Sequence, residues 1–521
     1  MRDLSLDTPM PIVWSVAGTD SGGGAGLAAD LRAADALGVH LCTVVAAVTA
    51  QNSQAVHQVQ AVPPAWLDQQ LAALADDMPP RAIKTGLLGS ADNVRVLVRW
   101  LDRLRQRQPV ALVVDPVLRA STGAALADDA LRAAYRELLL PRASVITPNR
   151  AEAAALLGHP AALSDGPGAV PAWAQALRGW GAEAVCITGG DADGALASDW
   201  LATPQAQGWL SLPRLPVRHH HGTGCTFASA LAAALALGHG AADAAVLAKL
   251  ATAGALRAGR PAGAGAGPVR AAAGFARPPA LLPQLSLDDQ PPQWADRPAT
   301  AAAAPGLYAI VDSAERVAAV LAAGADTVQL RIKQGPPALL RQEIAAAVAS
   351  ARRAGRPLFV NDHAALAMAC GAHGVHLGQE DLLALAPAER ARLRASGLAL
   401  GLSSHSLWEL CRAAAWQPAY LACGPVWPTT TKQMPWQAQG LDNLGWWCAL
   451  SPAPVVAIGG LLQPDQVAAV AEAGAAGACV VRGLGQQPAN TLPALAAAWQ
   501  RGRAAALHRP LPAPPLPHPC L

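Results

Sequence analysis

The chain has 521 residues, of which 52% are hydrophobic and only 14% are charged. Because disordered chains are rich in charge and poor in apolar residues, this composition excludes disorder throughout and predicts large buried cores. At about 150 residues per domain, the length predicts about three domains or two large ones. The net charge is +3 and no basic run exceeds two residues, so a nucleic-acid partner is not indicated; small anionic substrates need only local positive sites.

The cysteines indicate a reducing compartment. Nine are scattered along the chain without a CxxC pair, and nine is an odd number, so a disulfide framework is not expected. The apolar run at the N-terminus is short and ends in a glycine-rich loop, unlike a signal peptide. The chargeless stretch Gly222–Ala242 is interpreted as a buried core helix and not as a membrane span. We expect a cytoplasmic protein without a membrane partner, and a homo-oligomer is compatible with the sequence.

Two segments rich in Pro, Gly and Ala divide the chain. The first lacks hydrophobic periodicity and is interpreted as a linker, and the second closes the chain as a flexible tail. We therefore predict a first domain at 8–265, a linker at 266–304, a second domain at 305–505 and a tail at 506–521.

The first domain alternates short apolar runs with Ala- and Leu-rich helical stretches. Such alternation predicts an α/β domain in which helices cover both faces of a mostly parallel sheet. The candidate strands are Ile12–Ala17, Leu41–Val45, Ala82–Lys84, Ala111–Asp115, Val145–Thr147 and Ala184–Thr188.

The second domain shows eight apolar runs separated by helix-like stretches. Eight β/α units in about 200 residues predict a small TIM (β/α)8 barrel, in which chemistry is located at the carboxyl ends of the strands. Polar residues follow the apolar runs, at the positions where these carboxyl ends would lie. The eight apolar runs are Leu307–Val311, Thr327–Leu330, Leu358–Val360, Gly374–Leu377, Leu398–Leu402, Tyr420–Cys423, Val455–Ile458 and Ala478–Val481.

A glycine turn that leads into a helix is the main chemical feature of the first domain. The sequence His221-Gly-Thr-Gly-Cys225 exposes backbone N–H groups at a helix start, where anions bind. Cys225 lies in the first helical turn, which lowers the pKa of a thiol, and could accept a proton from a substrate hydroxyl. The alternative is a small buried cysteine at a tight turn.

Further motifs accompany this turn in order along the chain. Gly18–Gly26 follows the first strand, Ala50-Gln51-Asn52 ends the second, and Thr147-Pro-Asn149-Arg-Ala-Glu152 follows a later one. With the cysteine turn, they resemble the hydroxymethylpyrimidine and phosphomethylpyrimidine kinase family over nearly the whole domain. The resemblance implies a ribokinase-like three-layer α/β/α fold, with ATP as co-substrate and Mg²⁺.

The resemblance also implies roles for individual residues. The aminopyrimidine pocket would comprise Gly18, Asp30 and Gln51, and Gln51 can both donate and accept through its amide. Asp115 and Glu152 would help to hold Mg²⁺, with Asn149 and Thr188 near the nucleotide. Gly222, Thr223 and Gly224 would form the anion hole, and Cys225 would be the base. Many family members carry Lys where Thr188 stands, and the neutral hydroxyl brings no charge to the phosphates.

The second domain places cations and acids at its strand ends. Gln329, Arg331 and Lys333 alternate after the second run and should face one side, where the two cations would bind a diphosphate. Asp362 and Asp381 follow the third and fourth runs and suit Mg²⁺, although a salt-bridge network with Arg331 is the alternative. A second phosphate grip is expected from the loops at Thr429–Lys432, Gly459–Gly460 and Val481–Gly483.

Together with Gly401–His405 and Gly424–Thr429, these motifs resemble thiamine phosphate synthase over 305–485. The resemblance implies that a thiazole nitrogen captures the pyrimidine methylene cation after diphosphate leaves. The pyrimidine diphosphate site would comprise Gln329, Leu330, Arg331, Ile332, Lys333, Asn361, Ser403 and Lys432. The thiazole phosphate site would comprise Thr429, Thr430, Thr431, Gly460, Val481 and Arg482, and the Mg²⁺ ligands would be Asp362 and Asp381.

Two positions depart from the synthase pattern. Ile332 stands where many relatives carry an acid, which would loosen the geometry of Arg331 and Lys333. Arg482 stands where Ser is common; it either strengthens the monophosphate grip or points away and leaves the backbone N–H to bind.

The sequence therefore predicts a bifunctional enzyme of thiamine biosynthesis whose first domain makes the substrate of the second. One rival is a pyridoxal-type kinase fused to a barrel, because pyridine and pyrimidine alcohols are similar. A second rival is a chain in which one domain is retained as a ligand-binding regulator without turnover.

Overall fold

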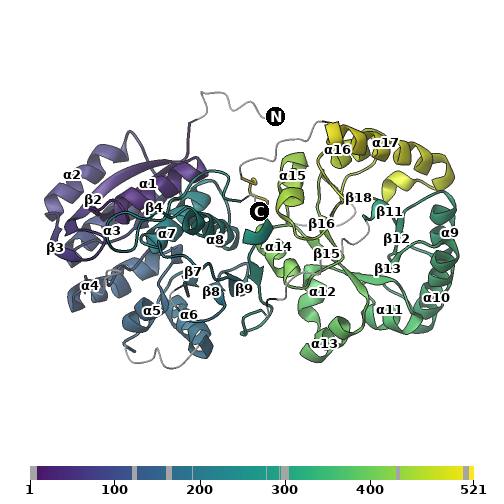
Figure 1. Cartoon of the computed structure of the whole chain (residues 1–521), viewed down its shortest axis with the longest axis horizontal. Coiled ribbons are helices and arrows are strands. Elements are labelled where there is room, and N and C mark those ends of the chain that lie inside the picture. The colour runs from purple at the N-terminus through teal and green to yellow at the C-terminus, as the bar shows by residue number, and fades with distance from the viewer. Residues whose placement is uncertain are drawn as a thin grey trace. The chain divides into compact units, whose positions relative to one another are not determined.

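The computed structural model describes residues 9–119, 126–159, 167–190, 192–276, 279–292, 294, 304–429, 435–508 and 516–521. The chain divides into two compact units (Figure 1). The first unit comprises Met1–Ala276 and Pro283–Trp294, and the second comprises Arg277–Leu282 and Ala295–Leu521.

One ten-stranded sheet runs through the described part of the first unit, in the order β10-β9-β8-β7-β6-β5-β4-β1-β2-β3. The pairs from β2 through β1, β4, β5 and β6 to β7 are parallel, and the outer pairs are antiparallel. The six expected strands are all present. The strands are β1 (Ile12–Gly18), β2 (His40–Gln51), β3 (Val56–Ala61), β4 (Ala82–Thr85), β5 (Ala111–Val114), β6 (Val145–Ile146), β7 (Ala184–Ile187), β8 (Leu196–Ala202), β9 (Gln207–Pro213) and β10 (Gln284–Leu285).

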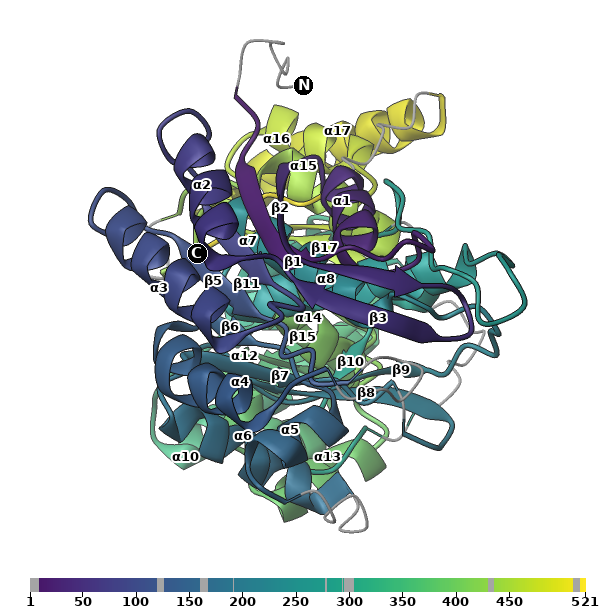
Figure 2. The ribbon, with the colours of Figure 1, turned by 90° about the vertical axis from the view of Figure 1, so that its left-hand side faces the viewer.

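Helices cover both faces of this sheet, which confirms the three-layer α/β/α architecture (Figure 2). Successive residues of a strand face opposite sides, and β1 shows this directly. Trp14 packs in the core that contains Leu67 and Leu97, whereas Ser15 bonds Asp30 on the other face. The helices are α1 (Gly26–Leu37), α2 (Pro64–Ala75), α3 (Ala91–Arg105), α4 (Asp129–Ala134), α5 (Arg150–Leu156), α6 (Val170–Gly179), α7 (Thr223–Ala236) and α8 (Ala241–Arg257), with short turns η1 (Tyr135–Leu139), η2 (Leu140–Arg142), η4 (Pro167–Ala169) and η5 (Pro279–Leu281).

The second unit is a closed barrel of parallel strands β11 to β18, as the eight runs predicted. Each described strand is followed by helical structure, which is the TIM-barrel pattern. The strands are β11 (Gly306–Val311), β12 (Thr327–Leu330), β13 (Leu358–Asn361), β14 (Gly374–Leu377), β15 (Ala399–Ser404), β16 (Tyr420–Cys423), β17 (Val455–Ala457) and β18 (Gly477–Val480). The helices are α9 (Ala314–Ala322), α10 (Pro337–Ala354), α11 (Ala364–Cys370), α12 (Gln379–Ala384), α13 (Pro387–Ala395), α14 (Leu407–Ala414), α15 (Gly440–Leu450), α16 (Pro464–Glu472), η6 (Arg482–Leu484) and α17 (Pro488–His508).

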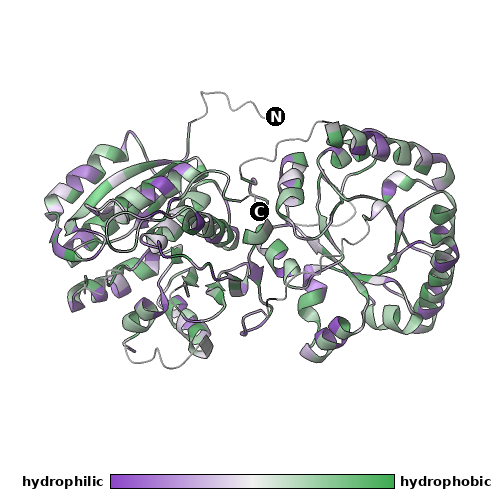
Figure 3. Cartoon of the chain, viewed as in Figure 1, coloured by the Kyte–Doolittle hydropathy of each residue, from purple (hydrophilic) through white to green (hydrophobic). Residues whose placement is uncertain are grey.

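The strands of both units are mainly hydrophobic (Figure 3). In the barrel, every residue of β12, β14, β16 and β18 is buried, because the strands face side chains inside and helices outside. Four strands of the first unit, β3 and β8 to β10, were missed from the sequence. β3 has no fully buried residue and β8 buries Asp199, so neither forms the continuous apolar run on which the prediction relied.

The sequence predicted a single helix over Gly222–Ala242, and this prediction is wrong. α7 ends at Ala236 and α8 begins at Ala241. Gly238 lies between them with a φ of 97°, a left-handed conformation that a helix interior cannot contain. Among the residues that the structure describes, no helix is long and apolar enough to cross a membrane.

Part of the expected linker is folded, which corrects the prediction that 266–304 is irregular. Val269, Phe275 and Leu285 are buried, and β10 pairs with β9 at the edge of the sheet. The side chain of Trp209 also donates to the carbonyl of Asp289 at 2.8 Å. Proline and glycine lower the propensity for regular structure, but tertiary contacts supply the partners here.

The end of the chain also differs from the expected flexible tail at 506–521. Residues 506–508 belong to α17, and residues 516–521 are bonded to the second unit. His518 donates its backbone N–H to the side chain of Asn443 at 2.8 Å, and Cys520 is buried.

Gly401 leaves room for the ring of Tyr420 inside the barrel. A Cβ atom at Gly401 would lie 2.3 Å from Cζ and 2.4 Å from the hydroxyl of Tyr420, which is fully buried. We expect Gly401→Ala to lower the free energy of unfolding of the second unit by about 1–3 kcal/mol, because overpacking forces the ring to move. Urea denaturation measures this. Gly335→Ala is the control, since its nearest neighbour lies at 3.6 Å; equal stability of both variants would contradict the packing argument.

Candidate functional site

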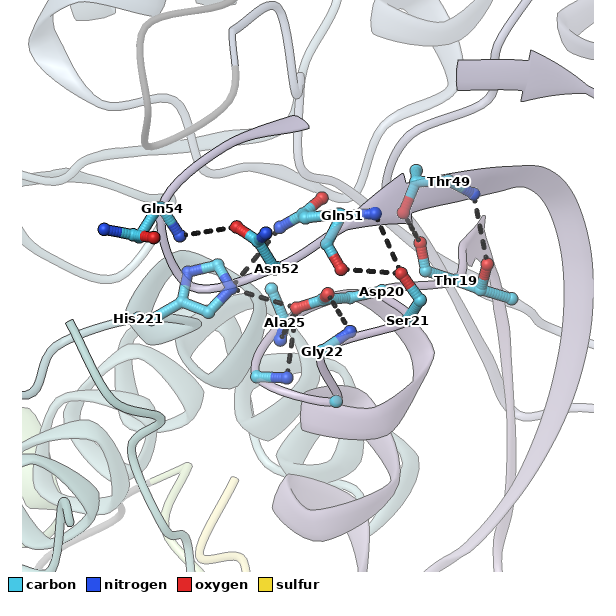
Figure 4. A network of polar contacts seen from close by, with 12 residues as sticks. Thr19, Asp20, Ser21, Gly22, Ala25, Thr49, Gln51, Asn52, Gln54 and His221 are labelled. Carbon is cyan, nitrogen blue, oxygen red and sulfur yellow. Dashed lines mark hydrogen bonds and ion pairs between the residues drawn. The ribbon is translucent and has the colours of Figure 1, made fainter. Parts of the chain in front are cut away.

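The loop after β1 is organised by a buried carboxylate that the sequence prediction did not single out. One oxygen of Asp20 accepts from the N–H of Gly22 at 2.8 Å, and the other accepts from Gly24 at 3.0 Å and Ala25 at 2.8 Å (Figure 4). Burial would raise the pKa of Asp20, but hydrogen bonds from His221 and from these backbone groups hold it below its ordinary value. Asp20 is therefore an anion that fixes the glycine loop.

This loop is joined to the cysteine turn through His221. Its Nε2 lies 2.9 Å from Asp20 and 3.5 Å from the amide nitrogen of Gln51 (Figure 4). Gln51 is anchored by Ser21, whose hydroxyl accepts from its backbone N–H at 2.8 Å. The structure thus brings the predicted pyrimidine residue Gln51 beside the start of the predicted catalytic turn, although the two are 170 residues apart.

The turn itself requires glycine. Gly222 has a φ of 87°, and a Cβ atom there would lie 2.1 Å from the carbonyl oxygen of Gly24. Gly222 is the N-cap of α7 and provides no capping side chain. Gly224 is exposed, and a Cβ atom there would have no neighbour within 4 Å. The arrangement suits backbone capture of an anion at the start of α7.

Behind the turn lies a buried cluster of charges that centres on Lys84. Its Nζ contacts the Asp30 carboxylate at 2.9 and 3.1 Å and the Asp115 carboxylate at 3.6 Å. Asp30 also accepts from the hydroxyls of Ser15 at 2.6 Å and Ser229 at 2.8 Å, and it has no exposed surface. Asp30 is therefore enclosed by these partners and positions Lys84, a residue that the sequence prediction did not name.

The pKa of the Cys225 thiol is raised, whereas the sequence predicted that it would be lowered. Burial raises the pKa of its thiol to about 12; Lys84 and the N–H of Gly26 lower it, while Asp30 and Asp115 raise it further. The expectation of a lowered pKa considered only the helix start and is wrong, because burial and two carboxylates outweigh that effect. Cys225 is accordingly a thiol at neutral pH in this arrangement.

The predicted nucleotide and metal residues lie near one another but have structural partners as well. Asn149 and Glu152 form a capping box at the start of α5, with two bonds of 2.9 Å. The N-x-x-E spacing could have indicated this role from the sequence. Thr188 lies beside this cap, since its N–H donates to Pro148 at 2.9 Å. Asp115 is buried, and burial raises its pKa to about 6, partly opposed by Lys84.

A glycine-rich segment assigned from the sequence to the end of the first domain and the start of the linker completes this site. The N–H of Gly265 donates to Ser53 at 3.1 Å, next to Gln51 and Asn52. Gly267 then pairs with the turn before α7, accepting from the His221 N–H at 3.1 Å. We call Gly263–Gly267 the glycine strap. It links the end of β2 to the residue before the anion-binding turn.

In the barrel, the predicted diphosphate residues lie at the carboxyl ends of neighbouring strands. Gln329 and Asn361 are buried, Arg331 is half-buried and Lys333 is exposed. The carbonyl of Ile332 lies 2.8 Å from Nε2 of His363, so this departure from the family pattern is held by the loop between β13 and α11. Leu330 is buried in the barrel wall.

Asp362 and Asp381 come together as expected for a cation site. Burial raises the pKa of Asp362, and the charge of Asp381 raises it further, while Arg331 and His363 oppose this. Asp381 also accepts from the N–H of Gly378 at 3.1 Å. Two adjacent carboxylates repel each other, and a hard divalent cation relieves that repulsion, so the pair fits Mg²⁺. The described residues hold no group of three or more His, Cys, Asp or Glu arranged for a metal.

A chain of hydrogen bonds crosses the barrel interior to this site. Gln329 donates to the Tyr308 hydroxyl at 3.2 Å, and that hydroxyl lies 2.7 Å from the hydroxyl of Tyr420. Tyr420 bonds Nδ1 of His376 at 2.8 Å, and Nε2 of His376 lies 2.9 Å from the Ser403 hydroxyl. The sequence prediction missed the two tyrosines and the histidine; polar side chains within apolar strand runs were the available signal.

The predicted monophosphate loops also meet. The N–H of Trp427 donates to Gly459 at 3.1 Å, and a Cβ atom at Gly460 would lie 2.6 Å from Trp427. Gly483 packs against Leu461 in the same way. Thr429, Gly460, Val481 and Arg482 therefore lie on adjoining loops, with the Arg482 side chain exposed. Thr430, Thr431 and Lys432 lie outside the described residues.

Burial lowers the pKa of His376 to about 4, and the charges of Arg331 and His405 lower it further. We expect His376 to stay neutral from pH 8 down to about pH 5, because it charges only as the pH falls to its lowered pKa. NMR of histidine-labelled protein measures this, with His376→Gln to assign the signal. A His376 resonance that titrates between pH 6 and 7 would contradict the enclosed network.

Comparison with known proteins now places both halves. Residues 20–270 match the phosphomethylpyrimidine kinase family model and residues 307–484 match the thiamine monophosphate synthase model. A protein of Oryza sativa subsp. japonica described as a probable thiamine biosynthetic bifunctional enzyme, chloroplastic, is 34% identical over 468 residues, covering 87% of this chain and 82% of its own. A thiamine-phosphate synthase of Serratia proteamaculans is 47% identical over 184 residues, which are 35% of this chain and 85% of its own.

Among solved structures, a pyridoxal kinase of Staphylococcus aureus in complex with ADP is 29% identical, covers 50% of this chain and 93% of its own, and has a TM-score of 0.45. The family matches confirm both resemblances stated from the sequence. The chain belongs to the family of bifunctional thiamine biosynthetic enzymes, which join a phosphomethylpyrimidine kinase and a thiamine monophosphate synthase in one polypeptide.

Proposed function

We propose that the cysteine turn of the first unit carries the phosphoryl transfers, from ATP to the hydroxymethyl oxygen of the pyrimidine and then to its monophosphate. In each step the acceptor oxygen forms a bond to phosphorus as the bond to the ADP oxygen breaks. Once its thiol has ionised, Cys225 would take the proton of the hydroxyl in the first transfer, and the N–H groups of Gly222, Thr223 and Gly224 would stabilise the phosphoryl oxygens. The juxtaposition of Cys225, Lys84 and Asp115 supports this proposal most directly.

The charges around Lys84 shift the pKa of the Cys225 thiol and so determine whether Cys225 is ionised and can act as a base. Lys84 favours the thiolate, whereas Asp30 and Asp115 oppose it. Asp115, helped by Glu152, would hold Mg²⁺, which supplies charge neutralisation of the phosphates. Neutralising Asp115 removes one of the two charges that raise the thiol pKa. Thr188 and Asn149 would contact the nucleotide, with Thr188 contributing a hydroxyl in place of an ammonium group.

For the second unit, we propose two sites that share the mouth of the barrel. The pyrimidine diphosphate would be bound by Gln329, Arg331, Lys333, Asn361, Ser403 and Lys432, and Asp362 and Asp381 would hold the Mg²⁺ that neutralises the leaving diphosphate. Thr429, Thr430, Thr431, Gly460, Val481 and Arg482 would hold the thiazole phosphate. The bond between methylene carbon and diphosphate oxygen breaks with its electrons on oxygen, and the thiazole nitrogen then bonds to that carbon.

Kinase specificity is the point at which a rival remains testable. A pyridoxal-type kinase would use a pyridine alcohol in place of the pyrimidine alcohol. Measuring kcat/KM for both alcohols with the full chain decides this: the proposal requires preference for the pyrimidine. A strong preference for pyridoxal would overturn it. A ligand-binding regulator would instead bind its compounds without turnover in one half.

The state of the cysteines bears on the cellular compartment of the protein. The cysteines in the described part of the chain are all free, so we propose a reducing compartment such as the cytosol for this protein. The rice relative is described as chloroplastic. Both activities take small phosphorylated molecules as their partners.

The two sites should fail independently. Because Cys225 contributes proton transfer only to the first reaction, Cys225→Ala should lower the first phosphorylation by about 10²–10⁴-fold while coupling of supplied pyrimidine diphosphate continues. Arg331→Ala and Asp362→Ala should do the reverse, with a loss of about 10²-fold in coupling. Separate assays of the three steps on the full chain measure this. A near-normal kinase rate for Cys225→Ala would contradict its assignment as base.

The glycine strap should matter to the kinase alone. A Cβ atom at Gly265 would lie 1.9 Å from the Ser53 carbonyl oxygen, so Gly265→Val would push the strap away from Gln51 and His221. We expect the KM for the pyrimidine alcohol to rise about tenfold or more, since such displacements misplace substrate. Ala264→Val, on an exposed neighbour, is the control. If the two variants gave equal KM values, the strap would be only a linker.

A further inference from the structure

The last six residues of the chain form a tail that binds two buried amide side chains. We call Leu516–Leu521 the C-terminal strap. The N–H of His518 donates to the Asn443 side chain at 2.8 Å, and Asn443 donates back to the His518 carbonyl at 3.0 Å. Nε2 of His518 lies 2.8 Å from the Gln439 carbonyl, and the Cys520 thiol lies 3.2 Å from the Gln439 side-chain oxygen.

These contacts satisfy polar groups that have no access to water. Gln439 has no exposed surface and Asn443 is 1% exposed. The N–H of Gln437 also donates to the Cys520 carbonyl at 2.9 Å, which fixes the chain just before α15. A buried amide that loses its partner is strongly unfavourable, so these bonds favour the docked strap over a free tail. The strap lies beyond residues 307–484, which match the synthase family model.

On its other side, Gln439 holds two loops of the barrel mouth. Its backbone N–H donates to the carbonyl of Pro425 at 2.7 Å, in the loop after β16. Its side-chain nitrogen donates to the carbonyl of His405 at 2.6 Å, in the loop after β15. His405 is fixed in turn by Glu409 at 2.9 Å and stacks on Trp436, with ring centroids 5.4 Å apart.

The loop after β16 continues this connection to the monophosphate residues. The N–H of Val426 donates to Ile458 at 2.9 Å, and the N–H of Trp427 donates to Gly459 at 3.1 Å. These bonds place the residues before Thr429 against the glycine pair that ends at Gly460. The path from strap to site thus runs through Gln439, the 425–427 loop and Gly459, in direct contacts throughout.

We propose that the C-terminal strap and Gln439 are positioning elements for the thiazole phosphate site of the synthase. Docking of the strap holds Gln439, and Gln439 holds residues 425–427, which precede Thr429 in the loop after β16, in register with Gly460. This inference rests on the proposed binding of the thiazole phosphate by Thr429 and Gly460. It assigns a task in coupling to a segment outside the part of the chain that matches the synthase model.

Removal of the strap tests the proposal in the full-length enzyme. A variant that ends at Pro515 lacks all of these contacts, and Asn443→Leu removes the hydrogen bonds of Asn443 to His518 and Cys520 without shortening the chain. For both, the KM for thiazole phosphate should rise about tenfold or more, because a small displacement of a binding loop is enough. The KM for pyrimidine diphosphate and the kinase kcat/KM should stay within about twofold of wild type, and a synthetic peptide of residues 516–521 should restore the truncated enzyme.

Controls separate the outcomes. Leu507→Ser, on a side chain that is 81% exposed, should leave all constants unchanged. An unchanged KM for thiazole phosphate in the truncated enzyme would overturn the proposal. A lower kcat together with higher KM values for both substrates and a lower Tm would also overturn it. Thr429→Val distinguishes the premise: if it leaves the thiazole phosphate KM unchanged, the proposed site is wrong, whereas an effect there without one from truncation rejects only the strap.

Discussion

Parallel strands carry their carboxyl ends to the same edge of a sheet, and both halves of this chain depend on that constraint. In the first unit, the loops that follow β1 and β2 meet the turn before α7, so Asp20, Gln51 and His221 become neighbours. In the second unit, the ends of β13 and β14 bring Asp362 to Asp381. Residues that are distant in sequence can therefore act on one phosphorylated molecule.

The polar groups buried beneath these edges differ between the two units. Lys84 lies between Asp30 and Asp115 with no exposed surface, and the nearby negative charges raise its pKa although burial would lower it. Removing one member of such a buried ion pair typically costs about 3–5 kcal/mol, because the remaining charge is left uncompensated. The barrel interior instead uses a neutral chain, in which His376 and two tyrosines connect Gln329 to Ser403. The kinase half thus holds fixed charge, whereas the synthase half holds fixed hydrogen-bond geometry.

The repeated β/α units of the barrel were the elements that the sequence predicted most completely. Eight apolar runs predicted eight barrel strands, because a buried parallel strand is continuously apolar. β3 was missed because it has no fully buried residue, β8 and β9 because polar residues interrupt their apolar runs, and β10 because it has only two residues. Asp362 and Asp381 could be paired in advance, since their positions follow from neighbouring strand ends. Lys84, Tyr308 and Tyr420 could not, because only tertiary packing shows that these polar side chains meet.

The dependence on tertiary contacts also explains why the predictions for the linker, the tail and Cys225 were wrong. The composition of the glycine strap and the C-terminal strap resembles that of linkers, yet both are held by hydrogen bonds to residues far away in the sequence. The acidity of Cys225 was misjudged for a related reason: a helix start is local, whereas the carboxylates of Asp30 and Asp115 reach the thiol through the fold. Local patterns indicate what a segment could do alone, and tertiary contacts decide what it does.

The central claim is that one chain makes a pyrimidine diphosphate and then consumes it. The most direct measurement supplies the full-length protein with the pyrimidine alcohol, MgATP and thiazole phosphate, and quantifies ADP and thiamine phosphate by chromatography. The account predicts thiamine phosphate as product with two ADP formed for each molecule. Formation of a single ADP per pyrimidine alcohol without any thiamine phosphate would contradict it.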